Sequence, residues 1–368
     1  MERKARQYQE IGIMTAKEET YRRLLPEAVA LIGATRDLIA DMANVSALLH
    51  QAFGFWWTGF YRVQDGELVL GPFQGPVACT RIGYGKGVCG TAWKTGQTQV
   101  VPDVEAFPGH IACSSESRSE IVVPLRHRGE IIAVLDIDSR ELGTFDEEDA
   151  RWLEYLCAEL SCRIRPDLRD YIEAEILPRY DAFDKGHQRD HARTVIAQAL
   201  QLACWYDVDP DLVYMAAAYH DTGLCEDRKT HHTVSARIIR EDPRLREWFT
   251  PEQIETIAEA AEDHRASSDH APRTIYGKLI AEADRQIVPE TVIRRTVQYG
   301  LSHYPELDKE GHWQRTLEHL HEKYAEGGYL KLWIPQSPNA ARLEELRGWI
   351  RDEGRLRQLF ETYYTEER

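Results

Sequence analysis

Residues 117–139 read SRSEIVVPLRHRGEIIAVLDIDS, and this stretch decides the fold of the first half of the chain. Apolar and β-branched residues fill Ser119–His127 and Glu130–Ser139, and Arg128-Gly129 lies between them. Runs of this composition on either side of a short glycine-containing break are typical of two paired strands. The sequence therefore predicts a strand, a turn and a second strand.

The segments on both sides extend this sheet and cover it. Phe55–Val63 and Glu67–Phe73 flank an Asp65-Gly66 turn and read as two earlier strands. Thr15 begins a T-x-x-E capping box, and Asp146 precedes an apolar stripe at helical spacing. Helices, antiparallel strands and a closing helix together predict an α+β domain with an antiparallel sheet and flanking helices.

The loops between the two strand pairs carry three of the chain's seven cysteines. A cysteine taken alone is more often a buried packing residue. A redox thiol instead needs partial exposure and basic neighbours, which Arg81, Lys86 and His110 could supply. Three thiols in one glycine-rich region favour redox chemistry at Cys79, Cys89 and Cys113.

Five motifs follow one another in this half of the chain: G-P-x-x-G-x-x-A-C-T-R-I at 71–82, G-x-G-V-C-G-T-A at 85–92, F-P-G-H-I-A-C at 107–113, S-R-S-E-I-V-V-P-L at 117–125 and L-D-I-D-S at 135–139. This ordered set resembles the free methionine-(R)-sulfoxide reductase family, a branch of the GAF fold. The likeness covers about residues 14–162 and does not depend on a single thiol pair.

The resemblance implies a role for each thiol. Cys113 would attack the sulfoxide sulfur, Cys79 would resolve the resulting sulfenic acid as a Cys79–Cys113 disulfide, and Cys89 would be a secondary or alternative resolving thiol. A thioredoxin-like reductant would regenerate the dithiol. No cofactor is expected for this reaction.

The same resemblance implies a pocket for free methionine sulfoxide. Asp136 and Asp138 are two residues apart on a strand, so both face one side. Two alternatives stay open: the carboxylates could merely solvate an outer strand face, and the domain could be a ligand or redox sensor that regulates its partner. The implied pocket residues are Glu120, Asp136 and Asp138, with an aromatic wall at Trp57 and Tyr61.

The second half predicts an all-α domain. Residues 163–182 are charged and carry Pro166 and Pro178, which suggests a linker, and 183–368 reads as helices. His191, His220-Asp221 and Asp284 follow the order H...HD...D, which resembles the HD superfamily of metal-dependent phosphohydrolases. The resemblance covers about residues 183–300 and implies hydrolysis of a phosphate ester that the sequence does not identify.

Two further histidines extend the HD ligand set. His231 has an H-x-x-x-S spacing, and His264 follows in E-D-H-R-A-S-S. With them the site would hold two divalent ions such as Mn, Fe or Mg, bridged by Asp221. One metal with two ordinary surface histidines is the alternative, and His232 replaces His231 if the register slips by one.

Several remaining residues receive minor assignments. The candidate contacts to a substrate phosphate are His187, Lys229, Arg265 and Arg273. Cys157 and Cys162 are expected to be packing or surface thiols, and Cys225 a packing residue.

The whole chain limits the class of protein. Its 368 residues suggest two domains, and a net charge of −16 argues against nucleic acid as a partner. Seven cysteines, an odd number, argue against a structural disulfide framework. The sequence shows no membrane-length apolar run and no secretory signal, so we expect a cytoplasmic enzyme without a membrane partner. A homodimer stays open.

Overall fold

The computed structural model describes residues 15–32, 37–110, 116–183, 188–268 and 270–368. The chain divides into two compact units, residues 1–175 with 203–214 and residues 176–202 with 215–368. Within the described ranges, every helix is too short or too polar to cross a membrane.

The first unit is built on a six-stranded sheet with the order β3-β2-β1-β6-β5-β4. All its neighbouring strands are antiparallel. Both predicted strand pairs form, as β1–β2 and β5–β6, which confirms the expected α+β fold. The strands are β1 (Trp57–Gln64), β2 (Glu67–Gln74), β3 (Arg81–Gly83), β4 (Gln99–Val101), β5 (Ser119–His127) and β6 (Glu130–Ser139).

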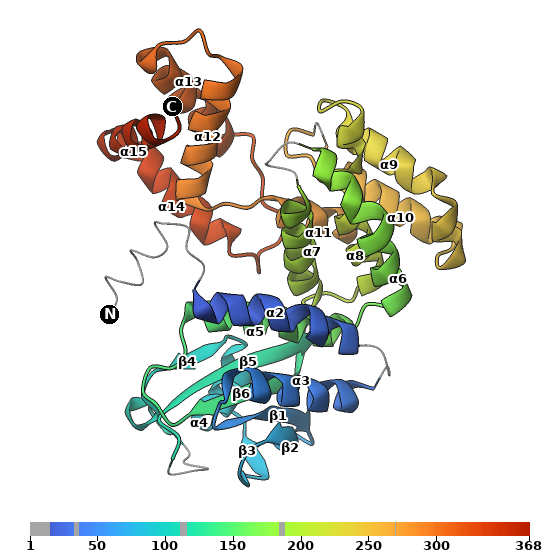
Figure 1. The fold of residues 1–368 in the computed structure, drawn as a ribbon, viewed down its shortest axis with the longest axis vertical. Helices are drawn as coiled ribbons and strands as arrows, with labels where there is room; N and C mark the ends of the chain where they lie inside the picture. The colour runs from blue at the N-terminus through green and yellow to red at the C-terminus, as the bar shows by residue number, and fades with distance from the viewer. Residues whose placement is uncertain (1–14, 33–36, 111–115, 184–187, 269) are drawn as a thin grey trace. The chain divides into compact units, whose positions relative to one another are not determined.

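Three helices cover one face of this sheet: α2 (Ala16–Leu31), α3 (Leu38–Phe53) and α5 (Glu147–Cys162) (Figure 1). Alternate strand residues such as Phe60, Val123 and Leu135 enter the core beneath them. Because successive side chains on a strand point to opposite faces, the residues between them face the other way. That second face packs on α4 (Gly87–Thr95) and the loops around it.

The expected linker, residues 163–182, is helical. It contains α6 (Pro166–Tyr171), a π-helical turn η2 (Ile172–Ile176) and a 3-10 helix η3 (Leu177–Ala182). The boundary between the compact units falls inside it, after Glu175.

The second half of the chain is all helical in the described ranges, as predicted. Its first part contains α7 (Arg189–Ala203), α8 (Pro210–Tyr219), the 3-10 helices η4 (Thr222–Cys225) and η5 (Pro243–Glu247), α9 (His231–Glu241), α10 (Pro251–Glu262) and α11 (Ile275–Asp284). A Thr250 capping box with Pro251 at the first helical position begins α10, because it satisfies backbone donors that the first turn leaves open.

Four further helices form a core of their own: α12 (Pro289–His303), α13 (Lys309–Tyr324), α14 (Asn339–Arg351) and α15 (Glu353–Glu366). The segment between α13 and α14 is fastened to α11 through the fully buried carboxylate of Glu282. This carboxylate accepts hydrogen bonds from Trp333 N at 2.7 Å and Asn339 Nδ2 at 2.9 Å. A buried charge that is satisfied in this way fixes the position of the segment.

Candidate functional site

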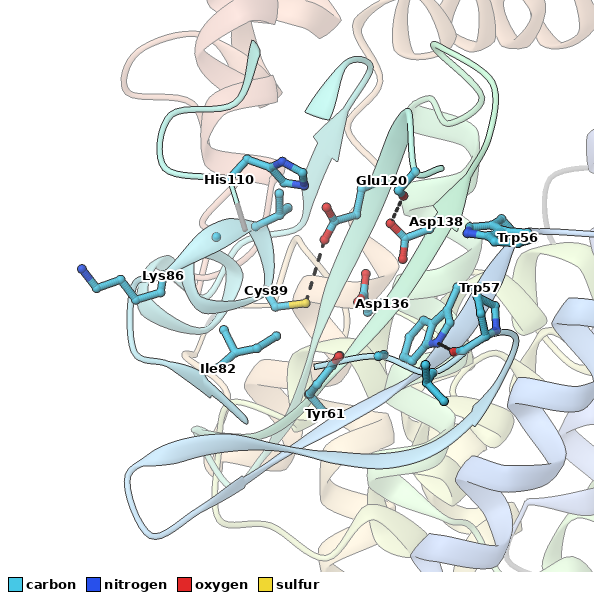
Figure 2. Close-up of a pocket in the computed structure, with 16 residues that line it drawn as sticks. Trp56, Trp57, Tyr61, Ile82, Lys86, Cys89, His110, Glu120, Asp136 and Asp138 are labelled. Carbon is cyan, nitrogen blue, oxygen red and sulfur yellow. Dashed lines mark hydrogen bonds between the residues drawn. The ribbon is translucent and has the colours of Figure 1, made fainter. Parts of the chain in front are cut away.

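A pocket opens on the sheet face that α4 covers. Three neighbouring strands supply its centre, because Glu120 on β5 lies opposite Asp138 on β6, which in turn lies opposite Trp57 on β1. Figure 2 shows the carboxylates of Glu120, Asp136 and Asp138 turned towards the same space as the Cys89 thiol. The lining also includes Trp56, Tyr61, Ile82, Lys86, His110 and Ser117.

Glu120 and Asp136 are buried and Asp138 is half-buried in the pocket, so the alternative in which Asp136 and Asp138 solvate an outer strand face is wrong. Glu120 is 7% exposed and Asp136 is 6% exposed. Asp136 Oδ1 has no hydrogen-bond partner among the described residues. A buried carboxyl oxygen without a partner is costly, unless a ligand completes its contacts.

Burial raises the pKa of all three carboxyl groups, and repulsion by a neighbouring carboxylate adds to the shift at Glu120 and Asp136. Burial first, and then the charge of Asp136, raises the pKa of Glu120 well above its usual range. Burial and the charge of Asp138 have the same effect on the pKa of Asp136. Burial raises the pKa of Asp138 to about 6, although a hydrogen bond from Ser117 opposes the shift. Carboxyl groups so arranged do not all ionise near neutral pH.

Trp57 and Tyr61 form one wall of the pocket. Their rings stack at 5.8 Å between centroids, and each ring is fixed by a hydrogen bond to the loop that carries Cys79. Trp57 Nε1 donates to Pro76 O at 3.1 Å, and Tyr61 Oη donates to Cys79 O at 3.0 Å. Gly59 leaves the space that this wall needs, since a Cβ there would lie 2.7 Å from Trp57 Cη2.

The cysteines of the first unit differ in environment. Cys89 is buried and donates to Glu120 Oε1 across 3.9 Å. Burial and the charges of Asp136 and Glu120 raise its pKa, which disfavours the thiolate. Cys79 is half-buried beside the pocket lining, and Cys113 lies outside the described residues.

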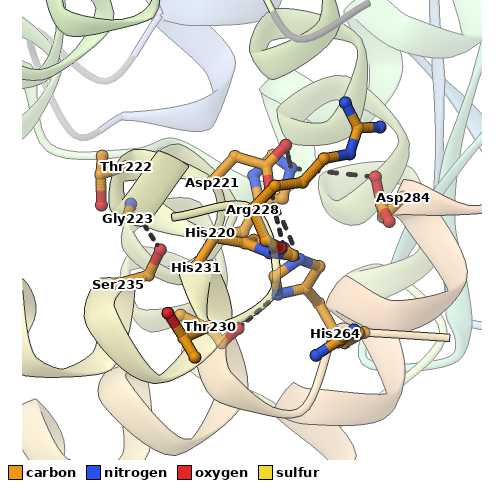
Figure 3. A network of polar contacts seen from close by, with 12 residues as sticks. His220, Asp221, Thr222, Gly223, Arg228, Thr230, His231, Ser235, His264 and Asp284 are labelled. Carbon is orange, nitrogen blue, oxygen red and sulfur yellow. Dashed lines mark hydrogen bonds and ion pairs between the residues drawn. The ribbon is translucent and has the colours of Figure 1, made fainter. Parts of the chain in front are cut away.

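A second cluster lies in the HD-like half and gathers all six predicted ligands. Figure 3 shows the cluster around Asp221. At one side of it, His191 Nε2 is 3.2 Å from Asp284 Oδ1. The helices bring them together from distant parts of the sequence: His191 is on α7, His220 and Asp221 follow α8, His231 begins α9, His264 follows α10, and Asp284 ends α11.

The two oxygens of Asp221 face two different groups of ligands. Oδ2 is 3.6 Å from His191 Nε2 and 3.3 Å from His220 Nε2. Oδ1 is 3.3 Å from His231 Nε2 and 3.4 Å from His264 Nε2. A carboxylate placed in this way can bridge two ions.

Hydrogen bonds at the Nδ1 atoms of His220 and His231 fix the tautomer that a metal ligand requires. His220 Nδ1 is 2.8 Å from Ala217 O, and His231 Nδ1 is 2.8 Å from Arg228 O. A carbonyl oxygen only accepts, so Nδ1 carries the proton and Nε2 turns its lone pair inward. His231 Nε2 lies 3.0 Å from His264 Nε2, where two lone pairs repel unless a cation lies beside them. The donor set therefore fits divalent metal ions.

Two residues that the sequence did not single out, Tyr180 and Ser235, hold this cluster in place. Tyr180 Oη accepts from Asp221 N at 3.2 Å and donates to Ala218 O at 2.9 Å. Ser235 Oγ accepts from Gly223 N at 2.9 Å and ties the turn after the His-Asp pair to α9. The H-x-x-x-S spacing was the available signal for Ser235, whereas Tyr180 lies in the expected linker and gave none.

Two of the minor assignments are wrong. Arg273 does not stand ready for a phosphate, because its guanidinium donates to the buried carboxylate of Asp263 at 3.0 Å and to Glu262 at 2.8 Å. Cys225 is exposed and does not pack.

The other minor assignments stay predictions. Arg265 donates to Lys229 O, and Lys229 itself is exposed. His187 lies outside the described residues. His232 Nδ1 is buried without a hydrogen-bond partner in the described part of the chain, and the ring packs edge-on against His231.

Comparisons with known proteins divide the chain in the same way. Residues 42–162 match the model of the GAF domain, and residues 189–286 match that of the HD domain. The free methionine-R-sulfoxide reductase of Escherichia coli is 48% identical over 145 residues, 39% of this chain and 88% of the relative. The yeast protein of that name is 44% identical over 149 residues, 38% of this chain and 83% of the relative.

A protein described only by its fold is also similar. The GAF domain-containing protein A of Dictyostelium discoideum is 58% identical over 139 residues, 38% of this chain and 88% of the relative. Among solved structures, the Neisseria meningitidis free methionine-R-sulfoxide reductase with its substrate is 52% identical, covers 41% of this chain and 92% of its own, and superposes with a TM-score of 0.39.

Proposed function

The chain belongs to the family of free methionine-R-sulfoxide reductases through its first unit, and from this premise we propose that it reduces free L-methionine-(R)-sulfoxide to methionine. The relatives of that name in Escherichia coli and yeast support the substrate. The observation that carries the proposal is the pocket in which the carboxyl groups of Glu120, Asp136 and Asp138 lie beside an aromatic wall.

The proposed reaction begins with attack of the Cys113 thiolate on the sulfoxide sulfur. The attack forms a bond between the two sulfurs, and the sulfoxide oxygen takes up a proton. The oxygen then passes as hydroxyl to the Cys113 sulfur while the sulfur–sulfur bond and the sulfur–oxygen bond of the substrate break, so methionine leaves and Cys113 becomes a sulfenic acid. The thiol of Cys79 then attacks that sulfur, a Cys79–Cys113 disulfide forms, and water leaves. A dithiol protein of the thioredoxin class returns two electrons to the disulfide.

The carboxyl trio supplies the acid and the binding charge that this reaction needs. Glu120 and Asp136 hold protons most firmly, because burial and the neighbouring charges raise the pKa of both. A protonated carboxyl group in contact with the substrate can give its proton to the sulfoxide oxygen as the bond breaks. Asp138, whose pKa is about 6, is mostly ionised near pH 7 and suits the substrate ammonium.

The raised pKa of Cys89 bears on the choice of nucleophile. A buried thiol among carboxyl groups holds its proton, so it is a poor attacking group. We assign Cys89 a secondary or alternative resolving role, in which it reacts only after the first sulfur has been oxidised.

Substrate selectivity tests this proposal. The full-length protein should reduce free methionine-R-sulfoxide in an NADPH-coupled thioredoxin assay. It should act much more slowly on N-acetylmethionine sulfoxide, which lacks the ammonium group. Equal rates on the two substrates would show that the carboxylates do not hold the ammonium. No turnover with either would favour a sensory GAF domain.

For the second unit we propose divalent-metal-dependent hydrolysis of a phosphate ester. The observation that carries this proposal is the convergence of four histidine Nε2 atoms on the two oxygens of Asp221. A pair of divalent ions in this donor set would activate water and polarise the phosphate ester. Asp221 bridges the two ligand groups, and the carbonyls of Ala217 and Arg228 hold their histidines in the ligating tautomer.

Metal analysis of purified variants tests the second proposal. Wild type should hold about two transition-metal ions per chain, and Asp221→Asn about none, because Asp221 serves both groups. His231→Ala should retain about one ion, and the matched control His232→Ala should retain about two. A similar loss in both histidine variants would move the ligand to His232, and equal metal in wild type and Asp221→Asn would place the site elsewhere.

A further inference from the structure

Two thiols outside both sites lie close together in the first unit. Cys162 is the last residue of α5, and Cys204 follows α7 in residues 203–214, which cluster with the first unit. Their Sγ atoms are 3.8 Å apart, although 42 positions separate them in the sequence. Neither thiol has a part in the proposed chemistry of the carboxylate pocket or of the metal cluster.

The backbone around the two thiols is fixed by contacts on both sides. Gly129 N, in the turn between β5 and β6, donates to Cys204 O at 2.8 Å. The next residue, Trp205, lies under the Arg126 guanidinium at 3.5 Å from the ring centroid. Ser161, which precedes Cys162, donates through its hydroxyl to Arg126 O. These contacts hold the two sulfurs near each other.

Both thiols line a small cavity, in which Cys162 is half-buried and Cys204 is buried. His127, Ser161, Cys162, Cys204, Tyr206 and Pro210 are among its lining residues. Cys157, one helical turn before Cys162, offers the contrast, because it is buried in the core between α5 and the sheet. A small oxidant can therefore reach Cys162 and Cys204 while Cys157 is shielded.

The proton distribution within the pair favours one thiolate. The hydrogen bond with Cys162 is the main cause that lowers the pKa of Cys204; burial opposes it, and the charge of Arg126 lowers the pKa further. The same hydrogen bond raises the pKa of Cys162. Cys204 is the better nucleophile, and Cys162 keeps its proton beside it.

We propose that Cys162 and Cys204 form a second redox site, a dithiol that a hydroperoxide oxidises to a disulfide. The Cys204 thiolate attacks one peroxide oxygen, the O–O bond breaks, and water or an alcohol leaves with a proton from solvent. Cys162 then attacks the Cys204 sulfenic acid, the S–S bond forms, and a second water leaves. The two thiols lose two electrons and the hydroperoxide gains them.

The disulfide would link the end of α5 to the segment between α7 and α8. A sulfur–sulfur bond is about 2.05 Å long, so the two atoms must approach by somewhat less than 2 Å, which side-chain rotation can provide. The bond would close the chain between residues 162 and 204 and limit local opening of this part of the first unit.

Peptide mapping of the full-length protein tests the proposal. Reduced protein is treated with a few equivalents of hydrogen peroxide, alkylated with N-ethylmaleimide and digested without reductant. Trypsin alone leaves Cys157 and Cys162 in one peptide, and Cys204 and Cys225 in another. Chymotrypsin is therefore added, because cleavage after Leu160 and Trp205 separates the two cysteines of each peptide.

We expect a peptide in which Cys162 is linked to Cys204. It should be absent in Cys162→Ser and Cys204→Ser and unchanged in the control Cys157→Ser. Circular dichroism should show that Cys162→Ser is folded. In this variant, dimedone should label Cys204 as a sulfenic acid. The exposed thiol of Cys225 reports whether the peroxide dose was sufficient. Oxidation of Cys225 while Cys162 and Cys204 remain fully alkylated would overturn the proposal.

Discussion

Replacing Asp138 by Asn should make the first unit more stable at neutral pH and impair its proposed activity. Asn has nearly the same shape, is neutral, and its amide oxygen can still accept the hydrogen bond that Ser117 donates to Asp138. The folded protein binds the Asp138 proton with a pKa of about 6, whereas the ordinary value is 3.8. Ionised Asp138 therefore costs folding free energy.

The size and sign of the effect follow from linkage. Because the folded-state pKa is raised, the stability that the neutral carboxyl provides is complete below pH 3.8 and is lost as the pH rises through 6. The cost of the ionised group is about 3 kcal/mol at pH 7.5, about 1.6 kcal/mol at pH 5 and about 0.5 kcal/mol at pH 4. Asp138→Asn should recover these amounts.

Hydrogen-exchange mass spectrometry of β6 peptides measures the opening free energy of the sheet at each pH. The matched control is Glu130→Gln, which neutralises an exposed carboxylate at the start of the same strand and should change little. We also expect kcat for free methionine-R-sulfoxide to fall about 100-fold. A stability gain that is equal at pH 4 and pH 7.5, or no gain at pH 7.5, would show that the ionised Asp138 carboxylate does not destabilise the folded protein.

Further substitutions test the wall, the helical extension and the recycling step. Gly59→Ala places a Cβ 2.3 Å from Phe73 Cβ and should destabilise the first unit by about 1–3 kcal/mol in urea titrations, whereas Gly348→Ala, with open space around it in α14, should not. Glu282→Gln weakens the acceptor for Trp333 N and Asn339 Nδ2, so hydrogen exchange should show that the opening free energy of the 330–339 segment falls by about 1.5–3 kcal/mol. The control Glu290→Gln, at an exposed position, should leave this opening free energy unchanged. Cys79→Ser should keep the first turnover in a rapid-quench experiment and lose the later ones, and normal steady-state turnover would exclude Cys79 as the resolving thiol.

The sequence predicted best what local pattern determines. Alternating apolar runs located β5 and β6, and their short turn at Arg128-Gly129 fixed the pairing. The resemblance to known families supplied residues that only the fold brings together, such as His191 and His264, because ligand motifs keep their order along the chain. The four expected histidine ligands surround Asp221, and Asp284 lies beside His191 and His220.

Partnerships set by tertiary contacts could not be predicted from local sequence. Arg273 looked like a phosphate contact, but it neutralises Asp263, which is 2% exposed and needs a positive partner. Nothing near Cys162 in the sequence indicates that Cys204 lies 3.8 Å away. A buried charge or a reactive thiol is explained by its neighbours in space, and these come from helices far apart in the chain.

The proposed role of Cys113 is tested by multiple turnover of free methionine-R-sulfoxide by the full-length protein and by Cys113→Ser, with a thioredoxin system. We expect steady NADPH consumption by wild type and none above background by the variant, while Cys157→Ser, which changes a thiol buried in the core, behaves as wild type. Full turnover by Cys113→Ser would rule out the proposed mechanism, because no attacking thiolate is then left.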